Sequence, residues 1–168
     1  MASASKFAIL GVPETYDLSG DELERKFREQ SLRLHPDRFV KAPAGERVAA
    51  LSKATALNDA YRTLRSPVGR AEHLLELGGK PLREGEHVEQ DFLMEILDLR
   101  EGLATARAAN DTATLGTLGA AVTARRDAAL ARLPDLFAHG QLDEAKKELI
   151  ALRYFQRFLD EHAGKDID

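Results

Sequence analysis

The tripeptide His35-Pro36-Asp37 separates two helical runs of this chain, Leu23 to Leu34 and about Glu46 to Leu64. Pro36 has no backbone N–H for a helix, and its ring disfavours the α conformation of the residue before it. The first run must therefore end at the tripeptide. We predict a helix, a sharp exposed loop and a second helix that returns antiparallel to the first. An exposed loop that presents an imidazole and a carboxylate between paired helices suits contact with another protein.

The first helix of this pair has one apolar face and one charged face. Ser19 is expected to cap it, with Glu22 as the capping-box partner. At roughly 100° per residue one arc gathers the expected buried side chains, which are Leu23, Phe27, Gln30 and Leu34. Four basic residues lie outside that arc: Arg25, Lys26, Arg28 and Arg33. Such charges usually indicate a solvated helix face, but beside the tripeptide they form a candidate electrostatic docking surface.

Further helices are predicted on both sides of this pair. A short apolar segment at residues 7–11 favours a brief helix or turn, and Pro67 suits the first position of a helix that ends at Gly78. Residues 79–88 form a polar boundary rich in glycine and proline. Three amphipathic stretches follow, near residues 89–109, 111–139 and 141–162, and Pro134 should end or kink the second. The fold class predicted is all-α, with the helix pair followed by an antiparallel three-helix bundle.

The composition narrows the possible functions. The 168 residues are 43% hydrophobic and 31% charged, which is typical of a soluble globular protein. The absence of cysteine excludes thiolate metal sites, disulfides and cysteine nucleophiles. No apolar run approaches membrane-spanning length and the N-terminus does not resemble a signal peptide, so a cytoplasmic protein is expected. The net charge of −4 argues against nucleic acid as a partner.

One predicted helix of the bundle has two apolar faces. A core stripe within roughly 60° comprises Phe92, Ile96, Leu99 and Leu103. A second patch on the other side, with Asp98, Arg100 and Glu101 at its rim, comprises Leu93, Met94 and Leu97. Either this patch packs against another part of the chain, or it is an exposed site that binds a protein. The last helix carries a similar secondary row of Ile150, Tyr154 and Phe158.

No catalytic or metal-binding pattern is present in the sequence. The five histidines form no HxxxH or HExxH pair, and His35 with Asp37 has no accompanying nucleophile. His73 and His139 are interpreted as polar edges of helices. No glycine-rich phosphate loop is found either. We therefore expect no enzyme activity, no cofactor and no metal.

The motifs on both sides of the tripeptide resemble a J-domain over roughly the first 78 residues. They are Phe27-x-x-x-Ser31-Leu32-x-Leu34, then Phe39, then Leu57-Asn58-x-Ala60-Tyr61-x-x-Leu64. Two further motifs extend the resemblance to the HscB-type J-proteins over nearly the whole chain. They are Arg70-Ala71-Glu72-x-Leu74-Leu75 and Phe92-Leu93-Met94-Glu95 followed by Leu97-x-Leu99-Arg100-Glu101. The lack of cysteine resembles the bacterial form, since eukaryotic relatives can carry a cysteine-pair zinc module.

The resemblance implies a co-chaperone of iron–sulfur cluster assembly with two partners. Its J-domain would stimulate a DnaK-like chaperone ATPase (HscA), and its bundle would bind the cluster scaffold protein (IscU). The chaperone-binding residues implied are His35, Pro36, Asp37, Arg25, Arg28 and Arg33. The scaffold-binding residues implied are Leu93, Met94, Leu97, Asp98, Arg100, Glu101 and Tyr154. Asp98 stands where family members more often have Glu, and Tyr154 where they often have Phe.

The domain boundaries expected are a J-domain at 1–78, a linker at 79–88 and a scaffold-binding bundle at 89–168. A monomer that binds neither nucleic acid nor membrane is predicted. Two alternatives remain open. One is a general J-protein with a different client, and the other is a helical adaptor that is not a chaperone, in which the tripeptide is accidental.

Overall fold

The computed structural model describes residues 4–165, and every regular element in that range is a helix, which confirms the predicted all-α class. The chain divides into two compact units, Met1–Pro81 and Leu82–Asp168. The predicted boundaries at 78 and 88 stay predictions, although no helix lies between Gly78 and Glu89.

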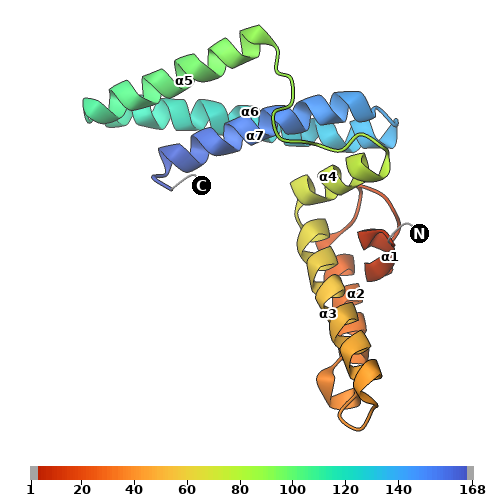
Figure 1. Cartoon of the computed structure of the whole chain (residues 1–168). Coiled ribbons are helices and arrows are strands. Elements are labelled where there is room, and N and C mark those ends of the chain that lie inside the picture. The colour runs from red at the N-terminus through yellow and green to blue at the C-terminus, as the bar shows by residue number, and fades with distance from the viewer. Residues whose placement is uncertain (1–3, 166–168) are drawn as a thin grey trace. The chain divides into compact units, whose positions relative to one another are not determined.

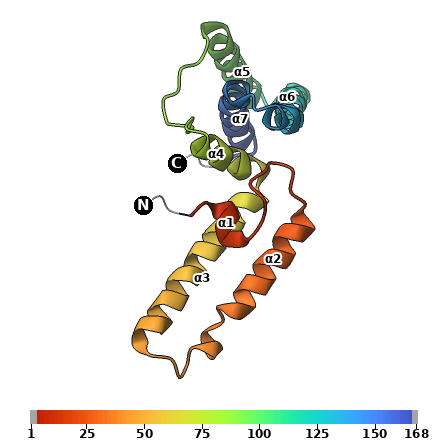
Figure 2. The same cartoon turned by 90° about the vertical axis from the view of Figure 1, so that its right-hand side faces the viewer.

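The first unit is built around two long antiparallel helices that lie side by side, with a tight turn at one end (Figures 1 and 2). Its elements are α1 (Lys6–Leu10), α2 (Gly20–Arg33), the 3-10 turn η1 (Pro36–Arg38), α3 (Ala44–Arg65) and α4 (Pro67–Leu77). Ser19 caps α2 as predicted, because its hydroxyl accepts a hydrogen bond from the N–H of Glu22 at 3.1 Å. Pro67 lies in the first turn of α4, also as predicted.

The core of the first unit comes from the predicted face of α2 and from the facing side of α3. Leu23 on α2 meets Leu57 and Leu64 on α3, and α1 adds buried apolar side chains to the same cluster. The rings of Phe27 and Tyr61 stack with centroids 4.3 Å apart. Burial of each large apolar side chain stabilises the fold by about 1.5–3 kcal/mol, so this cluster holds the two helices in register.

Arg70 and His73 are buried on α4, and the prediction of a polar helix edge for His73 is wrong. The Nε2 atom of His73 accepts a hydrogen bond from the backbone N–H of Lys6 at 3.1 Å, and its ring stacks on Phe7. The guanidinium of Arg70 donates to the carbonyl oxygens of Leu64 and Tyr16, at 2.9 and 2.8 Å. Burial lowers the pKa of Arg70, while the nearby Tyr16 and Asp17 act in the opposite direction. The two side chains thus tie α4 to preceding elements of the unit.

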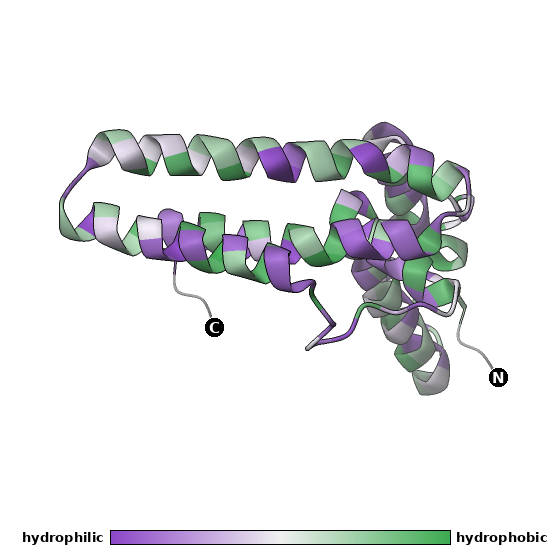
Figure 3. Ribbon diagram, turned by 90° about the horizontal axis from the view of Figure 1, so that it is seen from above, coloured by the Kyte–Doolittle hydropathy of each residue, from purple (hydrophilic) through white to green (hydrophobic). Residues whose placement is uncertain are grey.

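The second unit contains α5 (Gln90–Ala108), α6 (Thr112–Ala138) and α7 (Leu142–His162), within a residue or two of the predicted stretches. Apolar (green) and polar (purple) residues are interspersed along the helices (Figure 3), as expected of helices with one apolar face. The core cluster contains Ile96 and Leu103 from α5, Val122 from α6, and Phe155 and Phe158 from α7. Phe158 is therefore a core residue and not part of an exposed row on α7.

The α6 helix runs through Pro134 to Ala138, so the proline does not end the helix, and the alternative of a kink stays a prediction. Proline removes one backbone donor and crowds the preceding turn, which costs about 3 kcal/mol in a helix interior. Here it lies in the last turn and a half, directly after the fully buried Leu133. Burial of the Leu133 side chain offsets part of this cost and favours continuation of the helix beyond the proline.

None of the helices in the described range is long and apolar enough to cross a membrane.

Candidate functional site

The tip of the first unit presents the His-Pro-Asp tripeptide on the 3-10 turn. Its three residues are exposed, and the side chain of Asp37 is 86% exposed. His35 adopts φ −58° and ψ 134°, the extended conformation that the following proline imposes. The turn is closed by the backbone N–H of Arg38, which donates to the carbonyl of His35 at 3.0 Å. The loop therefore has a defined shape while its side chains stay accessible.

His35 and Asp37 are held together by a local hydrogen bond. The backbone N–H of Asp37 donates to Nδ1 of His35 at 3.2 Å, and Oδ2 of Asp37 lies 3.5 Å from the same nitrogen. A nitrogen that accepts the N–H bond cannot also donate a proton to the carboxylate. The neutral imidazole therefore carries its proton on Nε2, and the Asp37 carboxylate keeps both oxygens available to a partner.

The basic residues predicted for docking lie on the exposed surface of α2. Arg25, Arg28 and Arg33 are all exposed. Arg28 forms an ion pair with Glu24 at 2.6 Å, which neutralises part of its charge. Arg25 and Arg33 form no ion pair with any described residue. The free positive charge on this helix is therefore smaller than the sequence alone indicates.

The second apolar face of α5 is exposed in the structure. Leu93, Met94 and Leu97 are 39, 52 and 50% exposed, so they do not fill the bundle core. The other face of the helix supplies the buried Ile96 and Leu103, as predicted. The three exposed residues, called the α5 patch below, thus form an apolar surface that the fold of the second unit does not use.

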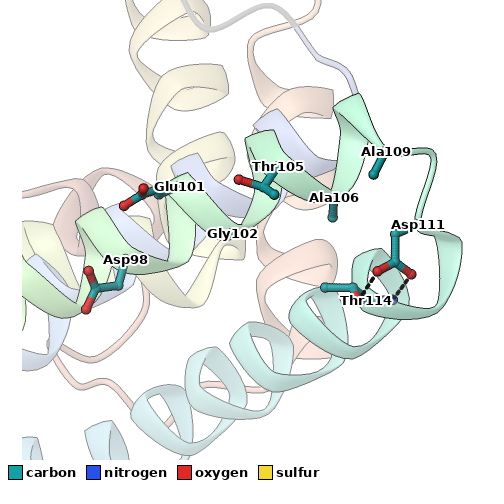
Figure 4. Close-up of a pocket in the computed structure, with 8 residues that line it drawn as sticks. All are labelled: Asp98, Glu101, Gly102, Thr105, Ala106, Ala109, Asp111 and Thr114. Atoms are coloured by element: carbon teal, nitrogen blue, oxygen red, sulfur yellow. Dashed lines mark hydrogen bonds between the residues drawn. The ribbon is translucent and has the colours of Figure 1, made fainter.

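The polar residues around the α5 patch differ in their surroundings. Asp98 and Glu101 are exposed and line a hollow of about 410 Å³ that extends to the start of α6 (Figure 4). Arg100 is also exposed, but its Nε lies 3.3 Å from Oε2 of Glu161 on α7. Tyr154 on α7 is half-buried, with its ring edge-on to Phe92 at 5.7 Å. The structure therefore places Tyr154 beside the residue that precedes the α5 patch.

The hollow beside Glu101 is lined at its far end by the cap of α6. The hydroxyl and the backbone N–H of Thr114 donate to Asp111 at 2.6 and 3.1 Å (Figure 4), which lowers the pKa of that carboxyl below its ordinary value. Asp98 and Glu101 lie on α5, whereas Asp111 is the N-cap residue before α6. In residues 4–165 no three histidine, aspartate or glutamate side chains converge as metal ligands.

Two features near these surfaces were missed by sequence reasoning. The carboxylate of Glu86 accepts from the N–H of Arg83 at 3.0 Å and lies 3.2 Å from Nζ of Lys146 on α7. These contacts lower the pKa of Glu86 and fasten the segment that leads into α5.

The other feature is a set of highly exposed apolar side chains near the tripeptide. Periodicity could have found it, because Val48 and Leu51 lie opposite the core face of α3.

The comparisons with known proteins cover both units. Residues 5–73 match the DnaJ domain, and residues 88–162 match the HSCB C-terminal oligomerisation domain. The chain is 34% identical over 158 residues to the co-chaperone protein HscB homolog of Aliivibrio fischeri, with 92% of each chain covered. It is 32% identical over 157 residues to that of Neisseria gonorrhoeae, covering 92% of this chain and 95% of the other.

Two solved structures have the same fold over almost all of this chain. Chaperone HscB from Vibrio cholerae superposes with a TM-score of 0.80 at 33% identity, with 96% of each chain covered. The human co-chaperone protein HscB superposes with a TM-score of 0.85 over 97% of this chain and 82% of its own. At 24% identity the second likeness concerns the fold alone.

Proposed function

This chain belongs to the HscB family of co-chaperones, and on that basis we propose that it serves iron–sulfur cluster assembly by bringing a scaffold protein to a chaperone ATPase. The second unit binds an IscU-type scaffold. The first unit engages an HscA-type chaperone and stimulates its ATP hydrolysis. The ATP chemistry belongs to the chaperone, and the iron–sulfur cluster is cargo of the scaffold.

The observation that carries the proposal is the exposure of the α5 patch. A helix in a three-helix bundle needs one buried stripe, and Ile96 with Leu103 already provides it. Leu93, Met94 and Leu97 remain exposed beside a charged rim, an arrangement that marks protein-binding sites. Apolar anchors at the centre of an interface typically carry about 2 kcal/mol or more each. Asp98, Arg100, Glu101 and Tyr154 are proposed to surround the anchors in the complex.

The His-Pro-Asp turn supports the chaperone half of the proposal. The Asp37 carboxylate is exposed on a turn of defined shape, so little conformational entropy is lost when it pairs. A guanidinium on the chaperone is the best-matched partner, because that pairing is directional and charge-assisted. Arg25, Arg28 and Arg33 are proposed to meet an acidic surface of the same partner.

Scaffold binding by the second unit and chaperone binding by the first unit are coupled because both units belong to one chain. When the scaffold is bound to the second unit, its effective concentration beside the chaperone rises, as for any pair of linked binding modules. ATP hydrolysis then retains the scaffold on the chaperone. No catalytic group of this chain is needed for the cycle, and the cytoplasm is the proposed location.

The test is a steady-state ATPase assay with a purified HscA-type chaperone. This chain should raise ATP turnover, and adding an IscU-type scaffold should raise it further. Turnover unchanged by this chain would reject the chaperone half. Stimulation without any response to the scaffold would reject the scaffold half and favour a general J-protein with another client.

The same preparation tests the oligomeric state. A monomer is proposed, whereas the matched C-terminal model is described as an oligomerisation domain. Sedimentation equilibrium over the concentration range of the assay distinguishes the two. A mass twice that of the 18.5 kDa chain would reject the monomer.

A further inference from the structure

The exposed large hydrophobic side chains of this protein are concentrated in two places. Eight such side chains are exposed in the described residues, and seven of them fall within residues 32–51 or 93–97. The second group is the α5 patch. In the first group Val40, Val48 and Leu51 are 66, 67 and 68% exposed, more than any member of the α5 patch. We call these three residues the tip stripe.

The tip stripe has no role in the core of the first unit. The α3 helix buries Ala50, Leu57, Ala60 and Leu64 against its neighbours. At roughly 100° per residue Val48 and Leu51 lie within about 60° of each other and about 100° or more from the centre of that buried face. A β-branched valine is also a poorer helix former than alanine or lysine. Packing in the core of the first unit therefore accounts for neither Val48 nor Leu51, and helix propensity does not account for Val48.

The tip stripe adjoins the His-Pro-Asp turn. Val40 follows Asp37 by three residues, and the 3-10 turn packs against α3. The intervening chain is compact, because the N–H of Ala42 donates to the carbonyl of Phe39 and the N–H of Glu46 to that of Pro43, each at 3.0 Å. A partner that reaches the Asp37 carboxylate therefore meets apolar surface next to it.

The charge around the tip stripe identifies the kind of partner. Residues 33–51 contain four basic side chains and two acidic ones, a net charge of +2. The basic residues are Arg33, Arg38, Lys41 and Arg47. None of the four forms an ion pair with a described residue, in contrast to Arg28 on the body of α2. A surface that is apolar at its centre and positive at its rim fits an apolar partner surface with an acidic rim. Two such tips repel each other, which disfavours a second copy as the occupant.

We propose that the tip stripe is an apolar docking surface for the chaperone ATPase, which the chaperone covers when it engages the His-Pro-Asp turn. This inference rests on the proposed function and adds a division of labour to it. Val40, Val48 and Leu51 supply affinity, whereas Asp37 supplies the stimulation of ATP hydrolysis. Burial of apolar side chains is non-directional and suits affinity, while a charge-assisted hydrogen bond is directional and suits a trigger.

The test compares a variant carrying Val48→Gln and Leu51→Gln with a matched control, Leu77→Gln. Glutamine forms helices well, and all three positions are exposed, so thermal midpoints should stay close to that of the wild type. In a titration of the chaperone ATPase, the double variant should need about tenfold or more of the protein for half-maximal stimulation. Its stimulation at saturation and its binding to the scaffold should equal those of the wild type. The control should titrate like the wild type.

Every other outcome contradicts either the assignment of the tip stripe to the chaperone interface or the proposed function. A double variant that titrates like Leu77→Gln removes the tip stripe from the chaperone interface while leaving the proposed function intact. A wild type that gives no stimulation rejects the proposed function itself. If the double variant loses self-association in sedimentation, or loses co-sedimentation with anionic phosphatidylglycerol vesicles, while its ATPase titration is unchanged, the stripe contacts a second copy or a lipid surface and the inference is wrong.

Discussion

Arg100 on α5 and Glu161 on α7 form an ion pair, with Nε of the arginine 3.3 Å from Oε2 of the glutamate. That carboxylate oxygen is buried and has no hydrogen bond of good geometry. The two atoms are close enough for an ion pair but are not aligned for a hydrogen bond, so the contact is electrostatic. A residue proposed to face the scaffold therefore also links two helices of the bundle.

This double role predicts different results for two variants. Arg100→Ala should weaken scaffold binding and lower the stability of the bundle slightly, by about 0.5–1 kcal/mol, because the pair is partly exposed. Glu161→Gln removes only the internal partner, so it should produce a similar loss of stability with a smaller loss of binding. Calorimetric titration with the scaffold, paired with thermal unfolding, separates the effects. Equal losses of binding in both variants would mean that Arg100 acts only by holding α5 in place.

Replacement of Asp37 by Asn should abolish stimulation of the chaperone ATPase. The change keeps the size of the side chain but removes the charge that a partner guanidinium requires. Because the side chain is 86% exposed, the free energy of unfolding should change by less than about 0.5 kcal/mol. Glu46→Gln removes another exposed carboxylate near the tip and should stimulate normally. Full activity of Asp37→Asn would contradict the J-domain role of the tripeptide.

Simultaneous replacement of Leu93, Met94 and Leu97 by Ser should abolish scaffold binding without unfolding the bundle. Exposed substitutions usually cost within about 0.5 kcal/mol each. Truncating the buried Ile96 to Ala, the matched control on the same helix, should cost about 2–5 kcal/mol. Thermal unfolding and scaffold binding are measured on both. Early unfolding of the triple variant would show that the patch belongs to the core, and unchanged binding would place the client site elsewhere.

Salt should weaken the two partner interactions to different extents. The proposed chaperone interface contains exposed basic residues such as Arg25 and Arg33, whose attraction is screened over about 10 Å at 0.1 M salt. The proposed scaffold interface is centred on apolar side chains and should respond less. Titrations of each partner between low and high ionic strength give the two slopes. Equal slopes would contradict the proposal that charge contributes more to the chaperone interface than to the scaffold interface.

Acid should loosen the second unit through Glu86 and Asp111. The pKa of each carboxyl is lowered in the folded protein, by the N–H of Arg83 and Lys146 for Glu86 and by Thr114 for Asp111. A lowered pKa means that the stabilisation is complete above the ordinary values of 4.5 and 3.8, and is lost as the pH falls below them. Glu86→Gln should make the thermal midpoint depend less steeply on pH in that range. An unchanged slope would mean that these contacts do not persist in solution.

Much of the chain could be predicted from local pattern because the responsible interactions are local. Proline geometry at residue 36 requires the break after α2, and the hydroxyl of Ser19 reaches a donor three residues away. The 3.6-residue period places Ile96 and Leu103 on one side of α5 and the α5 patch on the other, before any neighbour is considered. The motifs that resemble the HscB-type family also lie within single helices and the turn after α2.

Only the tertiary structure decided the contacts that join residues distant in the sequence. His73 is buried because Phe7 and the N–H of Lys6 meet it across 66 and 67 residues, and no helical pattern within α4 encodes that meeting. Phe158 enters the core, and Arg100 pairs with Glu161, because α5 and α7 pack at one particular register. Amphipathic periodicity determines which face of a helix is apolar. Packing between helices determines which side chains of different helices come into contact.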